Sequence, residues 1–93
     1  MDKISLTLFI AGQTLRSQSA VQNLRSFFDA GFDEQYELSI IDVLEHPQLA
    51  EEAKIIATPT LIKSNPPPVR RIVGDLADKE LILKWLDLGG FVS

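Results

Sequence analysis

The stretch ISLTLFIAGQT, residues 4–14, decides the fold of this chain. Its first seven residues place apolar side chains at alternate positions, which is the period-2 pattern of a β-strand. Ala11 and Gly12 interrupt that pattern. Thr14 can then cap a helix, because its side-chain oxygen can accept a hydrogen bond from a backbone N–H of the first turn. The stretch therefore predicts a strand that leads directly into a helix.

The chain continues with the same alternation of strands and helices. Leu15, Val21, Leu24 and Phe28 at helical spacing predict a helix, and Gly31 is its natural stop in the left-handed conformation. Residues 36–43 predict a second strand with apolar side chains on both faces, which is typical of a central, covered strand. Pro47 suits the first position of a second helix. The Thr58–Pro59 pair should end that helix, because the residue before a proline is pushed out of the α region.

The last third of the chain predicts a hairpin and a final helix. Strands are expected at 60–63 and 69–73, joined by a stiff proline run at 66–68, and either Asp75 or Asp78 can cap the helix that follows. The resulting order, β-α-β-α-β-β-α, predicts one domain over residues 1–93. Two crossover helices and the last helix are expected to cover both faces of a mixed, four-stranded sheet.

The composition excludes several classes of function. The 93 residues include no cysteine and one histidine, His46, so a disulfide framework, a thiolate metal site and a Cys-x-x-Cys redox pair are impossible. A net charge of −4 disfavours nucleic acid as a partner. The chain has no apolar run near the roughly 20 residues that span a bilayer, and no secretory signal is visible at its start. We therefore expect no membrane association and a cytoplasmic location.

The predicted element order resembles that of a thioredoxin-like domain. The loop over residues 11–17 lies where that fold carries its Cys-x-x-Cys pair, and here it contains Gln13, Thr14, Leu15 and Arg16. The Thr58–Pro59 pair matches the proline that faces the same groove in that fold. The resemblance thus implies a thioredoxin-like scaffold without thiol chemistry, and such a scaffold is expected to bind a partner.

Five blocks of sequence resemble the KaiB family of circadian clock proteins. The resemblance extends with almost no gaps from about Leu6 to Leu88, and the ordered series is far more specific than any single block. The blocks are FIAGQT (9–14), IDVL (41–44), HPQLAEE (46–52), IIATPTL (55–61) and PPPVRRIVGDL (66–76).

The resemblance implies a non-enzymatic clock regulator without a cofactor. Such a protein docks on the N-terminal ATPase ring of KaiC, modulates KaiC phosphorylation and there sequesters KaiA. The family also implies a second packing, of order β-α-β-β-α-α-β, in which the chain rests as a homo-oligomer, either a tetramer or a dimer. The element order that the residues predict, β-α-β-α-β-β-α, corresponds to the thioredoxin-like form.

Two other interpretations stay open. In the first, the chain resembles the KaiB-like, KaiC-binding sensor domain of a clock histidine kinase. In the second, it is a thiol-free, thioredoxin-like binding module of a KaiA-less stress or timer system. Leu15, Ser19 and Ser39 stand where the family commonly has proline, arginine and lysine, which indicates a divergent member and weighs against KaiA as a partner. A thioredoxin-family or glutathione-dependent enzyme is disfavoured, because the chain lacks cysteine.

Two sets of residues are predicted to carry the function. Adjacent strand residues point to opposite faces, so either Arg70 or Arg71 can pair with carboxylates of a partner, which the planar guanidinium favours. Glu37 and Ser39 share an outward face that can support strand addition if the strand is at an edge. The predicted partner-binding residues are Glu37, Ser39, Lys54, Pro59, Lys63, Arg70 and Arg71. The predicted fold-switch residues are Pro66, Pro67, Pro68, Gly74, Trp85 and Asp87.

Trp85 belongs to this second set because the family often has glycine at its position. Glycine costs a helix roughly 0.8–1 kcal/mol relative to alanine, and tryptophan costs less. Trp85 is therefore expected to favour the thioredoxin-like state, in which the last segment is helical.

Overall fold

The computed structural model describes residues 4–31, 36–65, 67–74, 81–82 and 84. Residues 81, 82 and 84 are helical, within the predicted final helix, whereas Asp75, Asp78 and Leu88 lie outside the described residues. The elements in chain order are β1 (Ile4–Ile10), α1 (Leu15–Gly31), β2 (Tyr36–Asp42), α2 (Pro47–Glu52), β3 (Thr60–Asn65) and β4 (Arg70–Val73).

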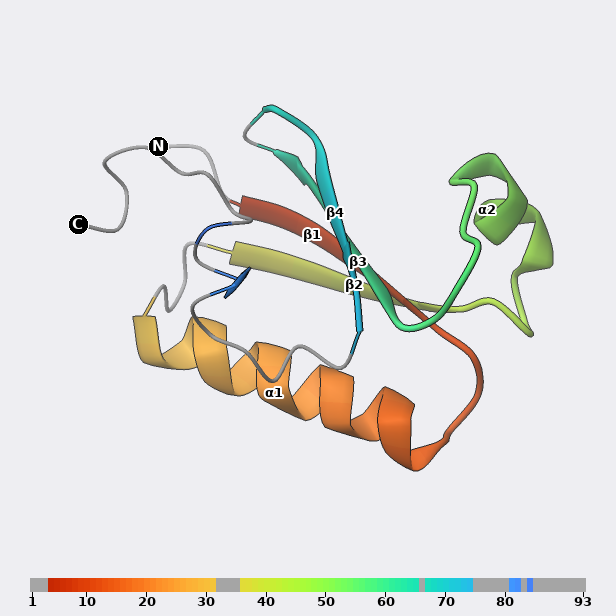
Figure 1. Ribbon diagram of the computed structural model, residues 1–93, viewed down its shortest axis with the longest axis horizontal. Coiled ribbons are helices and arrows are strands. Elements are labelled where there is room, and N and C mark those ends of the chain that lie inside the picture. Colours follow the sequence, from red (N-terminus) through yellow and green to blue (C-terminus); the bar gives the residue numbers. More distant parts are fainter. Residues whose placement is uncertain (1–3, 32–35, 66, 75–80, 83, 85–93) are drawn as a thin grey trace.

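The strands form a mixed, four-stranded sheet in the order β2-β1-β3-β4 (Figure 1). β1 is parallel to β2 and antiparallel to β3, and β3 is antiparallel to β4. The predicted mixed sheet and thioredoxin-like α/β class are confirmed. The second helix is not a parallel crossover as predicted, because the strand that follows it reverses direction.

The prediction that the second strand is central is wrong. β2 is an edge strand of the described sheet, and β1 and β3 occupy the centre. Leu38 and Ile40 lie opposite Leu6 and Leu8 of β1, on the face that packs toward α1. Apolar residues on both faces of a strand concern what packs above and below the sheet. They do not indicate whether the strand lies at the centre or at an edge of the sheet.

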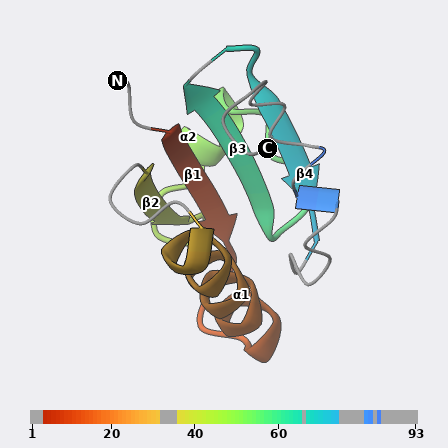
Figure 2. The same ribbon diagram turned by 90° about the vertical axis from the view of Figure 1, so that its left-hand side faces the viewer.

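The core lies between this face of the sheet and α1 (Figure 2). β1 contributes alternate side chains from Ile4 to Ile10, and α1 contributes a buried stripe at helical spacing. The Phe28 ring lies 5.1 Å from that of Phe27 and 5.0 Å from that of Tyr36. The buried core residues are Ile4, Leu6, Leu8, Ile10, Ala20, Leu24, Phe27, Phe28, Leu61 and Ile82.

Both ends of α1 follow the sequence prediction. The backbone N–H of Ser17 donates to Thr14 Oγ1 (3.0 Å), which is the expected cap, and the Thr14 hydroxyl donates to Ser17 Oγ (3.0 Å). The last residue of the helix is Gly31, so the predicted position of the end is confirmed, and its left-handed conformation stays a prediction. The Tyr36 hydroxyl donates to Asp29 Oδ1 (2.6 Å), which links the last turns of α1 to the start of β2.

The second helix is shorter and more exposed than predicted. α2 ends at Glu52, well before Pro59, because Lys54 adopts a left-handed conformation (φ 56°) that reverses the chain. None of the six residues of α2, all of them described, is buried. α2 projects past one end of the sheet instead of covering a face (Figure 1).

Within the described residues, no helix has the length and hydropathy needed to cross a membrane.

Candidate functional site

The candidate site is the α2 segment, residues 43–59, which connects β2 to β3. Asp42 fixes its start, because the Asp42 Oδ1 atom accepts hydrogen bonds from the backbone N–H groups of Gly12 (3.1 Å) and Leu44 (2.9 Å). Gly12 has φ +72°, a conformation that favours glycine, and a Cβ at this position would lie 3.4 Å from Leu44 Cδ1. The turn after β2 is therefore locked against the loop between β1 and α1.

The other end of the segment is anchored to the β3–β4 hairpin. Pro59 is buried and follows a cis peptide bond. Its carbonyl accepts a hydrogen bond from the backbone N–H of Gly74 (3.0 Å). The Thr60 hydroxyl donates to the carbonyl oxygen of Ala57 (2.5 Å). Pro59 therefore belongs to the scaffold of this region and offers little surface to a partner.

Arg71 makes a second connection between the hairpin and α2. Its guanidinium donates from Nη2 to the Ala53 carbonyl oxygen (2.8 Å) and from Nη1 to the Lys54 carbonyl oxygen (3.1 Å). These two carbonyls lie just after the C-terminal end of the helix. The structure thus brings together Lys54 and Arg71, two of the predicted partner-binding residues.

Three large apolar side chains of the α2 segment are exposed to solvent. The exposed fractions are 71% for Leu44, 42% for Leu49 and 97% for Ile56. We call these three residues the α2 face. Two hollows adjoin it, one of about 220 Å³ that includes Val43 and Ile56 and one of about 360 Å³ that includes Glu45 and Leu49. Three large exposed apolar side chains on one segment of 17 residues make this segment a candidate protein-docking site, since larger exposed apolar patches mark interaction sites.

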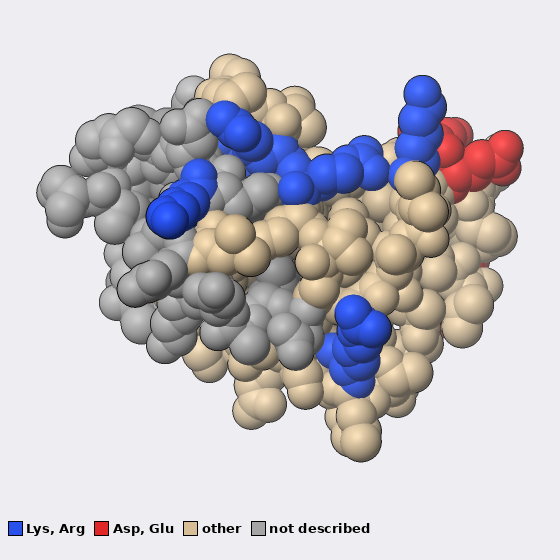
Figure 3. Space-filling model, viewed as in Figure 1, with Lys and Arg blue, Asp and Glu red and all other residues tan. Residues whose placement is uncertain are grey.

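Charged side chains are distributed unevenly around this region. Figure 3 shows a band of Lys and Arg side chains that runs across the molecule toward α2, where Asp and Glu side chains gather. Lys54, Arg70 and Arg71 are exposed, as are Glu51 and Glu52 of α2. A partner of the α2 face would therefore meet apolar groups bordered by charges of both signs.

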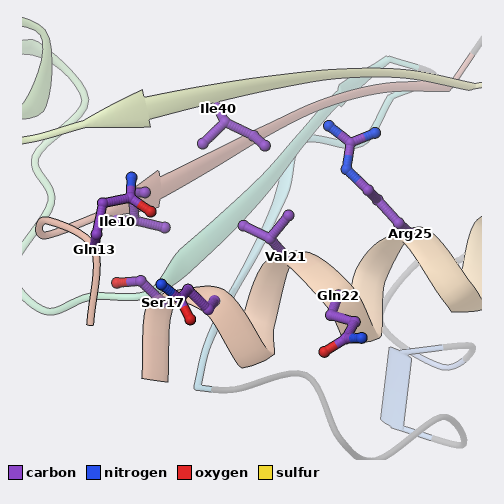
Figure 4. Close-up of a pocket in the computed structure, with 8 residues that line it drawn as sticks. Ile10, Gln13, Ser17, Val21, Gln22, Arg25 and Ile40 are labelled. Atoms are coloured by element: carbon purple, nitrogen blue, oxygen red, sulfur yellow. The ribbon is translucent and has the colours of Figure 1, made fainter. Parts of the chain in front are cut away.

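A separate groove of about 420 Å³ lies between α1 and the edge strand β2 (Figure 4). Its residues are Ile10, Gln13, Ser17, Gln18, Val21, Gln22, Arg25 and Ile40. None of these described residues is an acid or a histidine, and the Ser17 hydroxyl is bonded to Thr14. The groove can hold an apolar group, but it offers no base to activate a nucleophile. The described part of the chain also contains no cluster of metal-binding side chains.

The remaining predicted partner-binding residues are scattered. Glu37 and Ser39 are exposed on edge strand β2. Arg70 and Arg71 pair with Lys63 and Ile62 across the hairpin, so they lie on opposite faces as predicted. Lys63 is fully buried in this structure, which gives its side chain no exposed surface for the predicted partner contact. Its register places it opposite Leu6 on the core side of the sheet, where alternation along β3 directs it.

Of the predicted fold-switch residues, Gly74 contacts the end of the site through its bond to Pro59, and the others lie in the loop before β4 or outside the described residues. Pro67 and Pro68 are exposed and joined by a cis peptide bond, and Gly74 has φ +134°. Pro66, Trp85 and Asp87 lie outside the described residues. The expected effect of Trp85 on the helix stays a prediction.

Sequence reasoning missed Asp42 and the α2 face. An aspartate directly after a strand and next to a turn is a usable signal, because such side chains often bond to nearby backbone N–H groups. The α2 face gives no such signal, because apolar residues at helical spacing usually indicate a core.

The KaiB domain family model matches residues 7–88, nearly all of this site and its scaffold. The chain belongs to the KaiB family. The circadian clock oscillator protein KaiB of Synechococcus sp. (strain CC9311) is 55% identical over 83 residues, covering 89% of this chain and 70% of that protein. The circadian clock protein KaiB3 of Synechocystis sp. (strain ATCC 27184 / PCC 6803 / Kazusa) is 49% identical over 88 residues, covering 95% and 86%. Clock regulation is the class of function that membership supports.

Solved structures agree with the fold. The N-terminal domain of Synechococcus elongatus SasA matches this KaiB-family chain with a TM-score of 0.78 at 27% identity, covering 100% of this chain and 91% of that domain. Mitochondrial thioredoxin 3 of Saccharomyces cerevisiae matches with a TM-score of 0.70 at 20% identity, covering 90% and 76%, and this likeness concerns the fold alone.

Proposed function

We propose that this KaiB-family chain is a non-enzymatic regulator that binds the KaiC ATPase ring through the α2 face and modulates KaiC phosphorylation. The observation that carries the proposal is the exposure of Leu44, Leu49 and Ile56 on a segment held at both ends. Full burial of one such side chain is worth roughly 1.5–3 kcal/mol. The three together can therefore supply much of a docking energy.

The neighbouring charges give this surface a means of selecting its partner. Lys54 lies at the end of α2 and is exposed, and Glu51 and Glu52 are exposed on the helix itself. Charges at the rim of an interface mainly steer association and exclude wrong partners, whereas buried apolar groups supply affinity. We therefore assign affinity to the α2 face and selectivity to the charges around it.

A capture experiment tests the proposal. Immobilised full-length chain should retain KaiC in the presence of ATP, and Ile56→Ser should lose most of that capture. Arg16→Gln is the matched control, because Arg16 is exposed on α1 and lies outside the α2 segment. Equal capture by Ile56→Ser and wild type would remove the α2 face as the docking surface, and no capture by wild type would remove KaiC as the partner.

The edge strand β2 supports a second contact. Glu37 and Ser39 are exposed there, and within the described residues no further strand pairs with β2. An exposed edge can accept a strand from another protein, which here would be KaiA or a histidine kinase. Proline in place of Ser39 should abolish such a contact while KaiC capture persists, because Ser39 lies outside the α2 segment.

The match to the SasA N-terminal domain favours one alternative, the KaiC-binding sensor domain of a clock histidine kinase. The two functions differ in their effect on KaiC. A KaiB-type regulator should change the phosphorylation of KaiC when added alone, whereas an isolated sensor domain should bind KaiC and leave its phosphorylation unchanged. Light scattering of the free chain will show whether it rests as the tetramer or dimer expected of the family.

A further inference from the structure

The geometry points to Arg71 as a positioning residue that holds the α2 face in its docking orientation, so that partner binding depends on the pairing of β4 with β3. This inference deepens the proposed function, and its partner-binding part rests on that function. In this role, Arg71 binds carbonyl oxygens of its own chain. In the alternative role, its guanidinium would pair directly with a charge of the partner, and the two roles make different predictions.

The α2 helix cannot orient itself by packing. It has six residues, none of them buried, and isolated helices shorter than about 12 residues are marginal in water. Its apolar side chains Leu49 and, beyond its end, Ile56 face solvent. Burial of the helix itself therefore contributes little to its orientation, and polar contacts with the rest of the molecule have to contribute more.

Arg71 supplies the contact at the C-terminal end of the helix. Of the two carbonyls that it binds, that of Ala53 belongs to the C-cap, where a helix leaves carbonyl oxygens without intrahelical partners and carries partial negative charge, and that of Lys54 follows directly after it. A guanidinium can donate to both oxygens at once in a fixed geometry, and a lysine ammonium is a point charge without that fork. Hydrogen bonds from a charged donor are also stronger than neutral ones.

The two ends of the segment are tied to opposite edges of the sheet. Asp42 at the end of β2 holds the start of the segment through Leu44, and Arg71 of β4 holds the region after the helix. Arg71 is placed by the pairing of β4 with β3, in which it lies opposite Ile62. If β4 leaves the sheet, the segment loses the Arg71 contacts and the hydrogen bond between the Gly74 N–H and the Pro59 carbonyl, and keeps its attachment through Asp42 and its covalent link to β3.

Amide hydrogen exchange of the free, full-length chain tests the brace. The reporters are the backbone N–H groups of Ala53, Lys54 and Ile55, which donate to Leu49, Glu51 and Ala50. We expect Arg71→Gln to accelerate their exchange about tenfold, and Arg71→Lys to accelerate it less, because one bond can survive. Exchange in β1 should not change in either variant, since a general loss of stability would accelerate both regions.

Arg70→Gln is the matched control. Arg70 is the preceding residue of the same strand, is also exposed and lies on the opposite face. It should leave exchange at the three reporters unchanged. Equal rates in Arg71→Gln and wild type, or equal acceleration in Arg70→Gln, would overturn the inference.

Binding of KaiC at several salt concentrations separates a brace from a direct contact. Arg71→Gln should weaken binding several-fold with the same salt dependence as wild type, because no charge pair with the partner is lost. A smaller salt dependence in Arg71→Gln, absent in Arg70→Gln, would show direct pairing and overturn the brace. If the wild-type chain does not bind KaiC, the proposed function fails, and the exchange experiment still decides the role of Arg71.

Discussion

Helix α1 and the α2 segment both carry large apolar side chains, and the surroundings of these side chains are opposite. In α1, Ala20, Leu24 and Phe28 are fully buried against the sheet. In the α2 segment, Leu49 is 42% and Ile56 is 97% exposed. α1 lies along a face of the sheet, whereas α2 lies beyond its end (Figure 1). An apolar side chain in or near a helix thus does not say by itself whether the same chain covers it.

The largest expected effect comes from making the same substitution in both helices. Leu24→Ala removes a fully buried side chain and should lower the free energy of unfolding by about 2–5 kcal/mol. Leu49→Ala removes a side chain that is already partly in water and should cost under about 1 kcal/mol. Urea denaturation of the two variants measures the contrast. Equal losses would mean that α2 belongs to the core after all.

The next effect concerns the attachment of the α2 segment. Asp42→Ala removes the acceptor of two backbone N–H groups and should cost about 1–3 kcal/mol. Asp42→Asn keeps one side-chain oxygen in place and should cost less. Thermal or urea unfolding measures both. A loss in Asp42→Asn as large as that in Asp42→Ala would show that the charge of Asp42, and not its geometry, stabilises the turn.

The α2 face should separate binding from stability. Ile56→Ser should weaken KaiC binding about tenfold, which corresponds to about 1.4 kcal/mol, because an apolar anchor is lost. The free energy of unfolding should change by less than about 0.5 kcal/mol, since Ile56 is almost fully exposed. Titration with KaiC and urea denaturation of the same variant measure the two quantities. A large loss of stability would contradict the assignment of Ile56 to an interface.

The smallest effect is expected at the start of α1. Thr14→Ala should cost about 1 kcal/mol through loss of the helix cap, and Thr14→Ser should cost only a few tenths. Thr14 lies in the loop where thioredoxins carry their thiol pair, outside the α2 segment. KaiC binding should therefore stay unchanged in both variants. The measurements are urea denaturation and KaiC titration.

The sequence predicted the parts of the fold whose causes are local. Alternation marked β1, Thr14 marked the start of α1 and Gly31 marked its end, because each depends on neighbouring residues. The lateral order of the strands was not predictable in this way, and β2 was expected at the centre although it lies at an edge. Strand order depends on which distant segment pairs with which, and a single strand carries no record of that choice.

The candidate site was predicted only in part. Lys54 and Arg71 were predicted to bind a partner. The hydrogen bond that joins them depends on the left-handed conformation of Lys54, which no local sequence pattern indicates. Lys63 was predicted to contact a partner, yet it is buried, which is rare for lysine. Its position follows from its register with Leu6, and register is set by the whole sheet.

The attachment of the α2 segment at two sheet edges has an evolutionary consequence. The residues between Asp42 and Pro59 that we propose as the partner contact are exposed and are not those that hold the domain together. Substitutions among them can accumulate, or be introduced by an engineer, with little penalty for folding. The same scaffold can therefore acquire a new binding specificity through changes in the α2 segment alone.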